Sequence, residues 1–123
     1  MMRRISFLYL ALFSMLFTAN MPMQEVTAGG TSAQNFIRGD ANDDEVVNLA
    51  DGIKILSYLF LSEAINCPDA ADANDDGQID VTDAVALFSY QFTGSLPPAA
   101  PFPNCGVDPV GDTLADCNAN SCI

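Results

Sequence analysis

Carboxylate and amide side chains are concentrated in two twelve-residue strings of this 123-residue chain. Residues 40–51 read DANDDEVVNLAD, and residues 72–83 read DANDDGQIDVTD. Two carboxylates about 5 Å apart repel each other by about 1 kcal/mol even in water. Because a bound divalent cation removes this repulsion, the strings are candidate metal-binding loops.

The spacing of the oxygen-bearing residues fits a loop that wraps around Ca²⁺. This ion accepts about six to eight oxygens in flexible geometry, and a twelve-residue loop supplies them from positions 1, 3, 5, 7, 9 and 12. The first string predicts the ligands Asp40, Asn42, Asp44, the main-chain carbonyl of Val46, Asn48 and Asp51. The second string predicts Asp72, Asn74, Asp76, the carbonyl of Gln78, Asp80 and Asp83. Mg²⁺, which prefers rigid octahedral sites, and a merely solvated acidic loop are the alternatives.

The sixth loop position distinguishes the two strings. A sharp turn there usually requires glycine. The second string has Gly77, whereas the first has Glu45. A left-handed backbone at a residue other than glycine costs about 1–2 kcal/mol. The sequence therefore predicts that the Asp40–Asp51 site is the weaker one.

The acidic strings belong to a longer internal duplication. Residues 36–62 align with residues 68–94, so that each loop is followed by an apolar segment. Apolar residues recur at helical spacing in both segments, at Ile53, Leu56 and Phe60 and again at Val85, Phe88 and Phe92. Two short helices are expected to pack through these faces into one minimal core, with the repeats related by a rough two-fold.

The ends of these helices carry their own signals. Asn48 and Asp80 occupy expected N-cap positions, and Gly94 is expected to end the second helix. Pro68 before the second loop, and a Gly-rich polar stretch before the first, predict that no helix enters either loop. The predicted fold class is small and all-α.

The segment 1–28 is typical of an export signal. Two arginines precede the apolar run 5–17, ISFLYLALFSMLF, which suits a secretory h-region better than a membrane span. Cleavage is expected after Ala28, while an earlier cut and an uncleaved membrane anchor remain open. The protein is therefore expected to be extracellular or in the cell envelope.

The chain beyond this segment is strongly acidic. From residue 29 onward, 15 acidic and two basic residues give a formal charge of −13. Nucleic acid and anionic membranes need basic patches, so neither is an expected partner. An enzyme is not expected either, since the chain has no histidine and its carboxylates are already assigned to metal. No small-molecule substrate is predicted.

Four cysteines suggest two disulfides in an exported chain of this size: Cys67, Cys105, Cys117 and Cys122. Three pairings are possible. We favour Cys67–Cys105 with Cys117–Cys122, because the first would tie the inter-repeat loop to the tail and the second would close a short local loop. A cysteine metal site is the alternative.

A duplicated loop and helix, with Asp at the twelfth position and no entering helix, resembles a type I-like dockerin domain, an EF-hand-related module of secreted bacterial proteins. The motif D-x-N-x-D-G-x-[IV]-[ND]-x-x-D occurs twice within about residues 36–95, with Glu45 in place of glycine in the first copy. The segments FIRGDAND, CPDAADANDDG and PPAAPFPNCGVDPVGDTLADC strengthen the likeness. The resemblance implies a fold around two Ca²⁺ ions. It also implies docking onto cohesin domains that anchor enzymes, often polysaccharide-degrading ones, in extracellular complexes.

The predicted organisation is a signal peptide (1–28), a short linker (29–35), a dockerin-like domain (36–95) and a tail rich in Pro and Cys (96–123). The tail is expected to be a stapled cap over a small core, with a recognition segment as the alternative. The expected function is an exported, calcium-dependent protein-interaction module with a cohesin-like or other extracellular partner. The alternative is a calcium-stabilised structural component of a cell-surface or envelope assembly.

Overall fold

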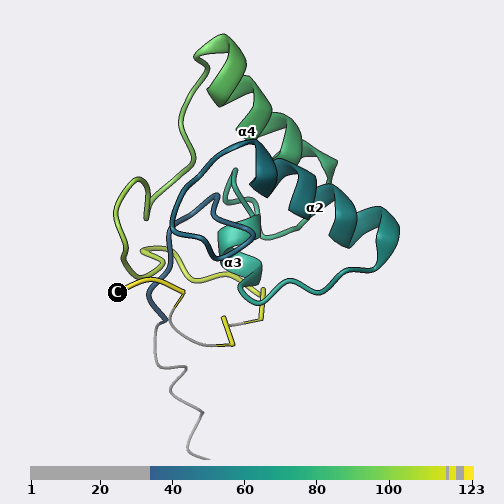
Figure 1. Ribbon diagram of the computed structural model, residues 1–123. Helices are drawn as coiled ribbons and strands as arrows, with labels where there is room; N and C mark the ends of the chain where they lie inside the picture. The colour runs from purple at the N-terminus through teal and green to yellow at the C-terminus, as the bar shows by residue number, and fades with distance from the viewer. Residues whose placement is uncertain (1–33, 116, 119–120) are drawn as a thin grey trace, which may run out of the picture. The chain divides into compact units, whose positions relative to one another are not determined.

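The computed structural model describes residues 34–115, 117–118 and 121–123. The expected export signal and most of the linker lie outside these residues. Within the described part, the elements are helices α2 (Leu49–Leu61), α3 (Pro68–Ala71) and α4 (Val81–Thr93) (Figure 1). No strand occurs there, only an isolated antiparallel bridge between Phe36 and Gly106. The expected small helical fold is confirmed at this level.

No helix in the described ranges combines the length and the apolar character that crossing a membrane would need.

Polar caps fix the ends of the two long helices. The side chain of Asn48 accepts a hydrogen bond from the amide of Ala50 at the start of α2, and Asp80 accepts one from Thr82 at the start of α4. At the other end of α4, Gly94 is left-handed with φ of 67°. The predicted caps at Asn48, Asp80 and Gly94 are therefore confirmed.

Helices α2 and α4 pack against each other across a small apolar core (Figure 1). Ile55 of α2 and Leu87 of α4 are fully buried at its centre, and Val47 and Ile79 of the two loops pack against it. The helices come close at Gly52, where an added Cβ would clash with the ring of Phe88.

The predicted core face of each helix is wrong in part. Leu56 and Phe88 do pack against the core, but Phe60 is 70% exposed and Phe92 is 69% exposed. Ile53 and Val85, the other members of these rows, are also more than half exposed. Because α2 carries apolar residues around most of its circumference, helical spacing alone could not tell which row faces inward.

A one-turn helix precedes the second loop, contrary to expectation. Helix α3 has Pro68 in its first turn and ends directly before Asp72. Proline is tolerated at the first helical position because its missing N–H would have no intrahelical partner there. Pro68 therefore starts a short helix rather than preventing one.

The tail folds back along the segment that precedes the first loop. Phe36 and Gly106 exchange main-chain hydrogen bonds of 2.9 and 3.0 Å, and the amide of Ser121 donates to the carbonyl of Asn35 at 3.0 Å. The amide of Asn118 donates to the carbonyl of Asn66 at 2.8 Å. The end of the tail thus reaches the connection between the repeats.

Two disulfides hold this arrangement, but the favoured pairing is wrong. The bonds join Cys67 to Cys117 and Cys105 to Cys122. Cys67 and Cys117 lie in a second buried cluster with Phe36 and Ala70. Because the returning tail brings Cys117 beside the inter-repeat connection, Cys67 pairs with it instead of with Cys105.

Candidate metal centre

The first acidic string forms a tight loop held by its own carboxylates. Asp40 is buried, and its two carboxylate oxygens accept hydrogen bonds from the amides of Asp44 (3.0 Å) and Glu45 (2.8 Å). Asp51, also buried, accepts from the amides of Asn42 (3.2 Å) and Asn48 (2.7 Å). The first and twelfth residues of the string therefore organise the backbone between them.

The other predicted ligands complete this loop. The carboxylate of Asp44 accepts from the amide of Val46 at 2.9 Å and from the side-chain amide of Asn42 at 2.9 Å. The side chain of Asn48 donates to the carbonyl of Val46 at 3.0 Å. Five predicted side-chain ligands and one predicted carbonyl ligand are thus joined in one hydrogen-bonded loop.

The second string repeats this pattern at equivalent positions. The carboxylate of Asp72 accepts from the amides of Asp76 (3.1 Å) and Gly77 (2.7 Å). Asp83 accepts from the amides of Asn74 (3.3 Å) and Asp80 (2.8 Å).

The middle of the second loop also follows the first. Asp76 accepts from the amide of Gln78 at 3.0 Å and from the side-chain amide of Asn74 at 3.0 Å. The five predicted side-chain ligands of the second string are thereby joined in one hydrogen-bonded loop, as those of the first are.

The backbone turns in the same way at matching positions. The fourth residues, Asp43 and Asp75, have φ of 60° and 61°, and the sixth residues, Glu45 and Gly77, have φ of 66° and 80°. All four are in the left-handed region, which glycine adopts without a Cβ penalty. The left-handed turn expected at the sixth position is present in both loops, and it is made with glycine in one loop and with glutamate in the other.

Burial makes the twelfth-position carboxylates costly to ionise. Desolvation raises the pKa of Asp51 and of Asp83 to about 6, although the hydrogen bonds that they accept from main-chain amides act to lower it. Desolvation also raises the pKa of Asp40. Hydrogen bonds from Thr82 lower the pKa of Asp80. A cation beside the buried carboxylates would offset their cost of ionisation.

Two further acidic groups involve the tail, which the sequence did not indicate. Carboxylate oxygens lie within 4.8 Å of one another in the groups Asp69, Asp108, Asp112 and Asp72, Asp75, Asp112. Acidic groups of this kind could hold a metal ion. Neither group is one of the predicted ligand sets, although Asp72 belongs to the second predicted set as well. Because Asp112 lies in the tail, far along the chain from the second loop, spacing could not show this contact.

A buried arginine lies next to these carboxylates and was also missed. The side chain of Arg38 is 0% exposed, and its guanidinium pairs with Asp75 and Asp108 at 3.0 Å each. The Arg38 guanidinium partly opposes the desolvation that raises the pKa of Asp75. In the sequence, Arg38 stood out only as one of two basic residues after the leader.

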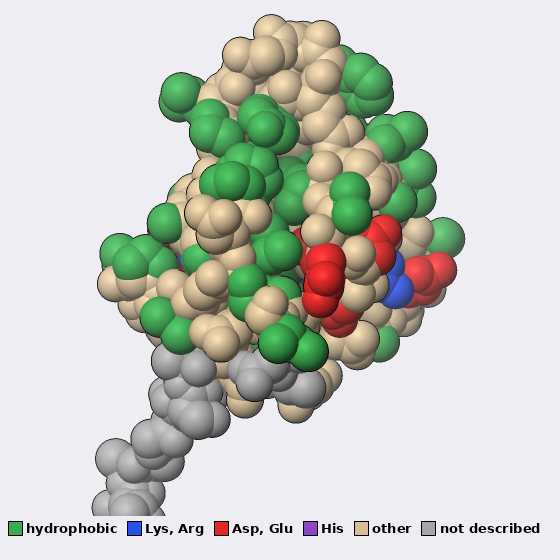
Figure 2. Space-filling model, turned by 60° about the vertical axis from the view of Figure 1, so that its left-hand side comes forward, with side chains coloured by type: hydrophobic (Ala, Val, Ile, Leu, Met, Phe, Trp, Pro, Cys, Tyr) green, Lys and Arg blue, Asp and Glu red, His purple; other side chains and the backbone are tan. Residues whose placement is uncertain are grey.

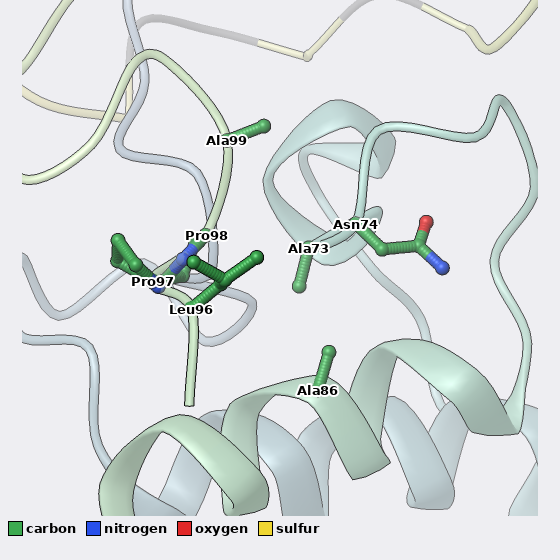
Figure 3. Close-up of a pocket in the computed structure, with 7 residues that line it drawn as sticks. All are labelled: Ala73, Asn74, Ala86, Leu96, Pro97, Pro98 and Ala99. Atoms are coloured by element: carbon green, nitrogen blue, oxygen red, sulfur yellow. The ribbon is translucent and has the colours of Figure 1, made fainter. Parts of the chain in front are cut away.

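A mostly apolar pocket of about 240 Å³ lies where the tail meets the second loop and α4. Figure 3 shows the side chains of Ala73, Ala86 and Leu96 facing a common space, while the amide of Asn74 points away from it. Pro97, Pro98 and Ala99 complete the lining. The amide of Ala99 donates to the carbonyl of Ala73 at 3.4 Å, so the tail contacts the second loop directly.

Hydrophobic side chains are numerous on the surface, and Figure 2 shows several of them on one face beside a group of acidic side chains. The long helices contribute matching rows of exposed residues, which occupy equivalent positions in the two repeats. These rows are Leu49, Ile53 and Phe60 on α2 and Val81, Val85 and Phe92 on α4.

Comparisons of this chain with protein-family models, with curated proteins and with solved structures find no match.

Proposed function

We propose that the protein is an exported, dockerin-like module that binds two Ca²⁺ ions and docks onto an extracellular protein partner. One observation carries the proposal. The hydrogen bonds that organise the loop around Asp40 and Asp51 recur around Asp72 and Asp83, with every donor and acceptor at the equivalent position of its string. Two copies of one loop, each rich in oxygen ligands, support the proposal that each loop binds an ion of the same kind.

The carboxylates retain capacity for an ion. A carboxylate has about four lone-pair sites, and the Asp40 side chain uses only some of them for the amides of Asp44 and Glu45. Hard oxygen ligands on a flexible twelve-residue loop favour Ca²⁺ over Mg²⁺, which needs near-octahedral geometry and retains water. Since Ca²⁺ binds the folded state, it should add to the free energy of unfolding by mass action.

The exposed rows on α2 and α4 support a docking role. Large exposed apolar patches on soluble proteins often mark interaction sites. Phe60 and Phe92 occupy equivalent positions on the two helices and are about equally exposed, at 70% and 69%. We expect a protein partner to cover them. By the resemblance to dockerins, this partner would be cohesin-like and part of a surface or polysaccharide-degrading complex.

The proposal is tested first by Ca²⁺ titration of the oxidised protein, followed by NMR at the amides of Glu45 and Gly77. Both amides donate to the first aspartate of their loop, so each reports on one loop. Both should shift and saturate with Ca²⁺ and return to their starting positions with EDTA. If neither amide responds to Ca²⁺, calcium binding is wrong.

The docking surface is tested by capture of extracellular proteins of the source organism, with Ca²⁺ and again with EDTA. Phe60→Ser and Phe92→Ser should abolish calcium-dependent capture while leaving the amide shifts intact. Leu61→Ser is the matched control, because Leu61 lies next to Phe60 on α2 and is 71% exposed but is outside the row. Equal capture by all three variants would show that these rows are not the docking surface.

A further inference from the structure

Arg38 connects three parts of the chain from a fully buried position. Its Nε donates to the carbonyl of Ala100 in the tail at 2.9 Å. Its Nη1 donates to the carbonyls of Asp69 at 3.0 Å and Asp72 at 2.9 Å. Asp72 begins the second loop, so the guanidinium holds the main chain of that loop and of the tail at once.

The remaining nitrogen of the guanidinium makes ion pairs with the same two parts. Nη2 lies 3.0 Å from the carboxylate of Asp75, the fourth residue of the second loop, and 3.0 Å from that of Asp108 in the tail. Nη2 makes these contacts as ion pairs and not as hydrogen bonds. The directed donors are Nε and Nη1, and a lysine ammonium cannot supply the same fixed fork of donors.

We infer that Arg38 is a positioning residue that locks the tail onto the second loop and thereby sets the affinity of that loop for its cation. This inference rests on the proposed function of the loops. The guanidinium fixes the main chain at Asp72, whose side chain is the first predicted ligand, and the left-handed turn at Asp75. A loop that is held in its binding geometry before the ion arrives loses less conformational freedom on binding.

The first loop has no counterpart of this arrangement within the described residues. Ala70 stands where the duplication would place the equivalent of Arg38. The fourth residue of the first loop, Asp43, accepts a hydrogen bond from the exposed side chain of Asn66 at 3.0 Å. The lock is therefore specific to the second loop.

Charge alone predicts the opposite effect from positioning. A guanidinium near a cation site repels the cation, so removing its charge should tighten binding if Coulomb forces dominate. If Arg38 acts by positioning, its removal should weaken binding despite the lost repulsion. The sign of the change in affinity therefore distinguishes the two effects.

The experiment uses oxidised protein produced from the full chain, titrated with Ca²⁺ and followed at the amides of Gly77 and of residue 45. Arg38→Lys keeps the charge, and Arg38→Met removes it. Both variants should lower the affinity of the second loop for Ca²⁺ by about fivefold or more, the usual range of coupling between sites. The affinity of the first loop should change by less than about twofold. Hydrogen exchange at the amide of Ala99 should become faster in both variants, because the tail is released from the second loop.

A second pair of variants decides the matter if the Arg38 variants do not fold. Asp75→Asn and Asp43→Asn each remove one charge from the fourth position of a loop, so a pure charge effect would weaken both loops equally. The lock predicts that Asp75→Asn weakens its own loop several-fold more than Asp43→Asn weakens the other.

Two outcomes would overturn the inference. The first is an unchanged or higher affinity of the second loop for Ca²⁺ in folded Arg38→Met protein. The second, where the Arg38 variants do not fold, is equal losses in the Asn pair. Either result leaves the proposed function standing, provided that the wild-type amides respond to Ca²⁺. If neither wild-type amide responds, the proposed function is wrong and the inference falls with it.

Discussion

Replacing Glu45 with glycine should stabilise the protein. Glu45 has φ of 66°, and its amide donates to Asp40 at 2.8 Å, as the amide of Gly77 donates to Asp72 at 2.7 Å. The two loops thus hold the same conformation at this position, but one of them includes a Cβ. The left-handed conformation costs about 1–2 kcal/mol at a residue with a Cβ. Glycine offsets about 0.5–1 kcal/mol of this gain, because its unfolded chain has greater conformational freedom to lose on folding.

The expected net gain for Glu45→Gly is therefore about 0.5–1 kcal/mol in the free energy of unfolding. Urea unfolding of the oxidised protein in EDTA measures it without a contribution from the ion. Glu45→Ala is the control, because it removes the same charge but keeps the Cβ. The difference between the glycine and alanine variants therefore isolates the backbone strain.

The reverse change in the other loop provides an independent check. A Cβ at Gly77 would meet only the Cβ of Asp112, at 3.8 Å, which is ordinary contact. Gly77→Ala should therefore lower the free energy of unfolding by about 0.5–1 kcal/mol through backbone strain alone. The reasoning is refuted if Glu45→Gly is no more stable than Glu45→Ala, or if Gly77→Ala is as stable as the wild type.

Three further changes test the fold and its electrostatics. Replacing Cys67 and Cys117 with serine opens a link across 50 residues and should lower the free energy of unfolding by about 4 kcal/mol, measured in urea. Removing the other disulfide, which spans 17 residues, should lower it by about 3 kcal/mol. Gly52→Ala should lower the free energy of unfolding by about 1–3 kcal/mol, because the added methyl overlaps an aromatic ring of α4; a gain in stability would contradict this packing. In EDTA, the free energy of unfolding should fall as the pH rises from about 4 to about 7, since the folded-state pKa of Asp51 and Asp83 is raised from 3.8 to about 6. A rise over this interval in urea unfolding would contradict the burial of these carboxylates.

Local spacing in the sequence was sufficient to predict the helix caps at Asn48, Asp80 and Gly94. Asn48 and Asp80 begin their helices as expected, and the side-chain members of each predicted ligand set are joined by hydrogen bonds within their own string. These features depend on contacts between residues close together in the chain, which follow from residue type and spacing. The left-handed turn at Glu45 was predictable for the same reason.

Long-range contacts were not predictable from spacing. Arg38 precedes the first loop and Asp108 lies in the tail, and nothing in either segment indicates that they meet. The pairing of Cys67 with Cys117 likewise depends on the path of the returning tail. The inward face of α2 was ambiguous because Ile53 and Ile55 are equally apolar, yet only Ile55 is buried.

The two differences between the loops act in the same direction. Glu45 strains the first loop, and Arg38 supports the second, so Ca²⁺ should fill the second loop at the lower concentration. Each difference can be removed separately: Glu45→Gly should tighten the first loop, and Arg38→Lys should weaken the second. The titration midpoints of the amides at residues 45 and 77 should therefore approach each other in either variant and lie closest in the double variant. If the midpoints remain as far apart in the double variant as in the wild type, neither residue is the source of the difference between the loops.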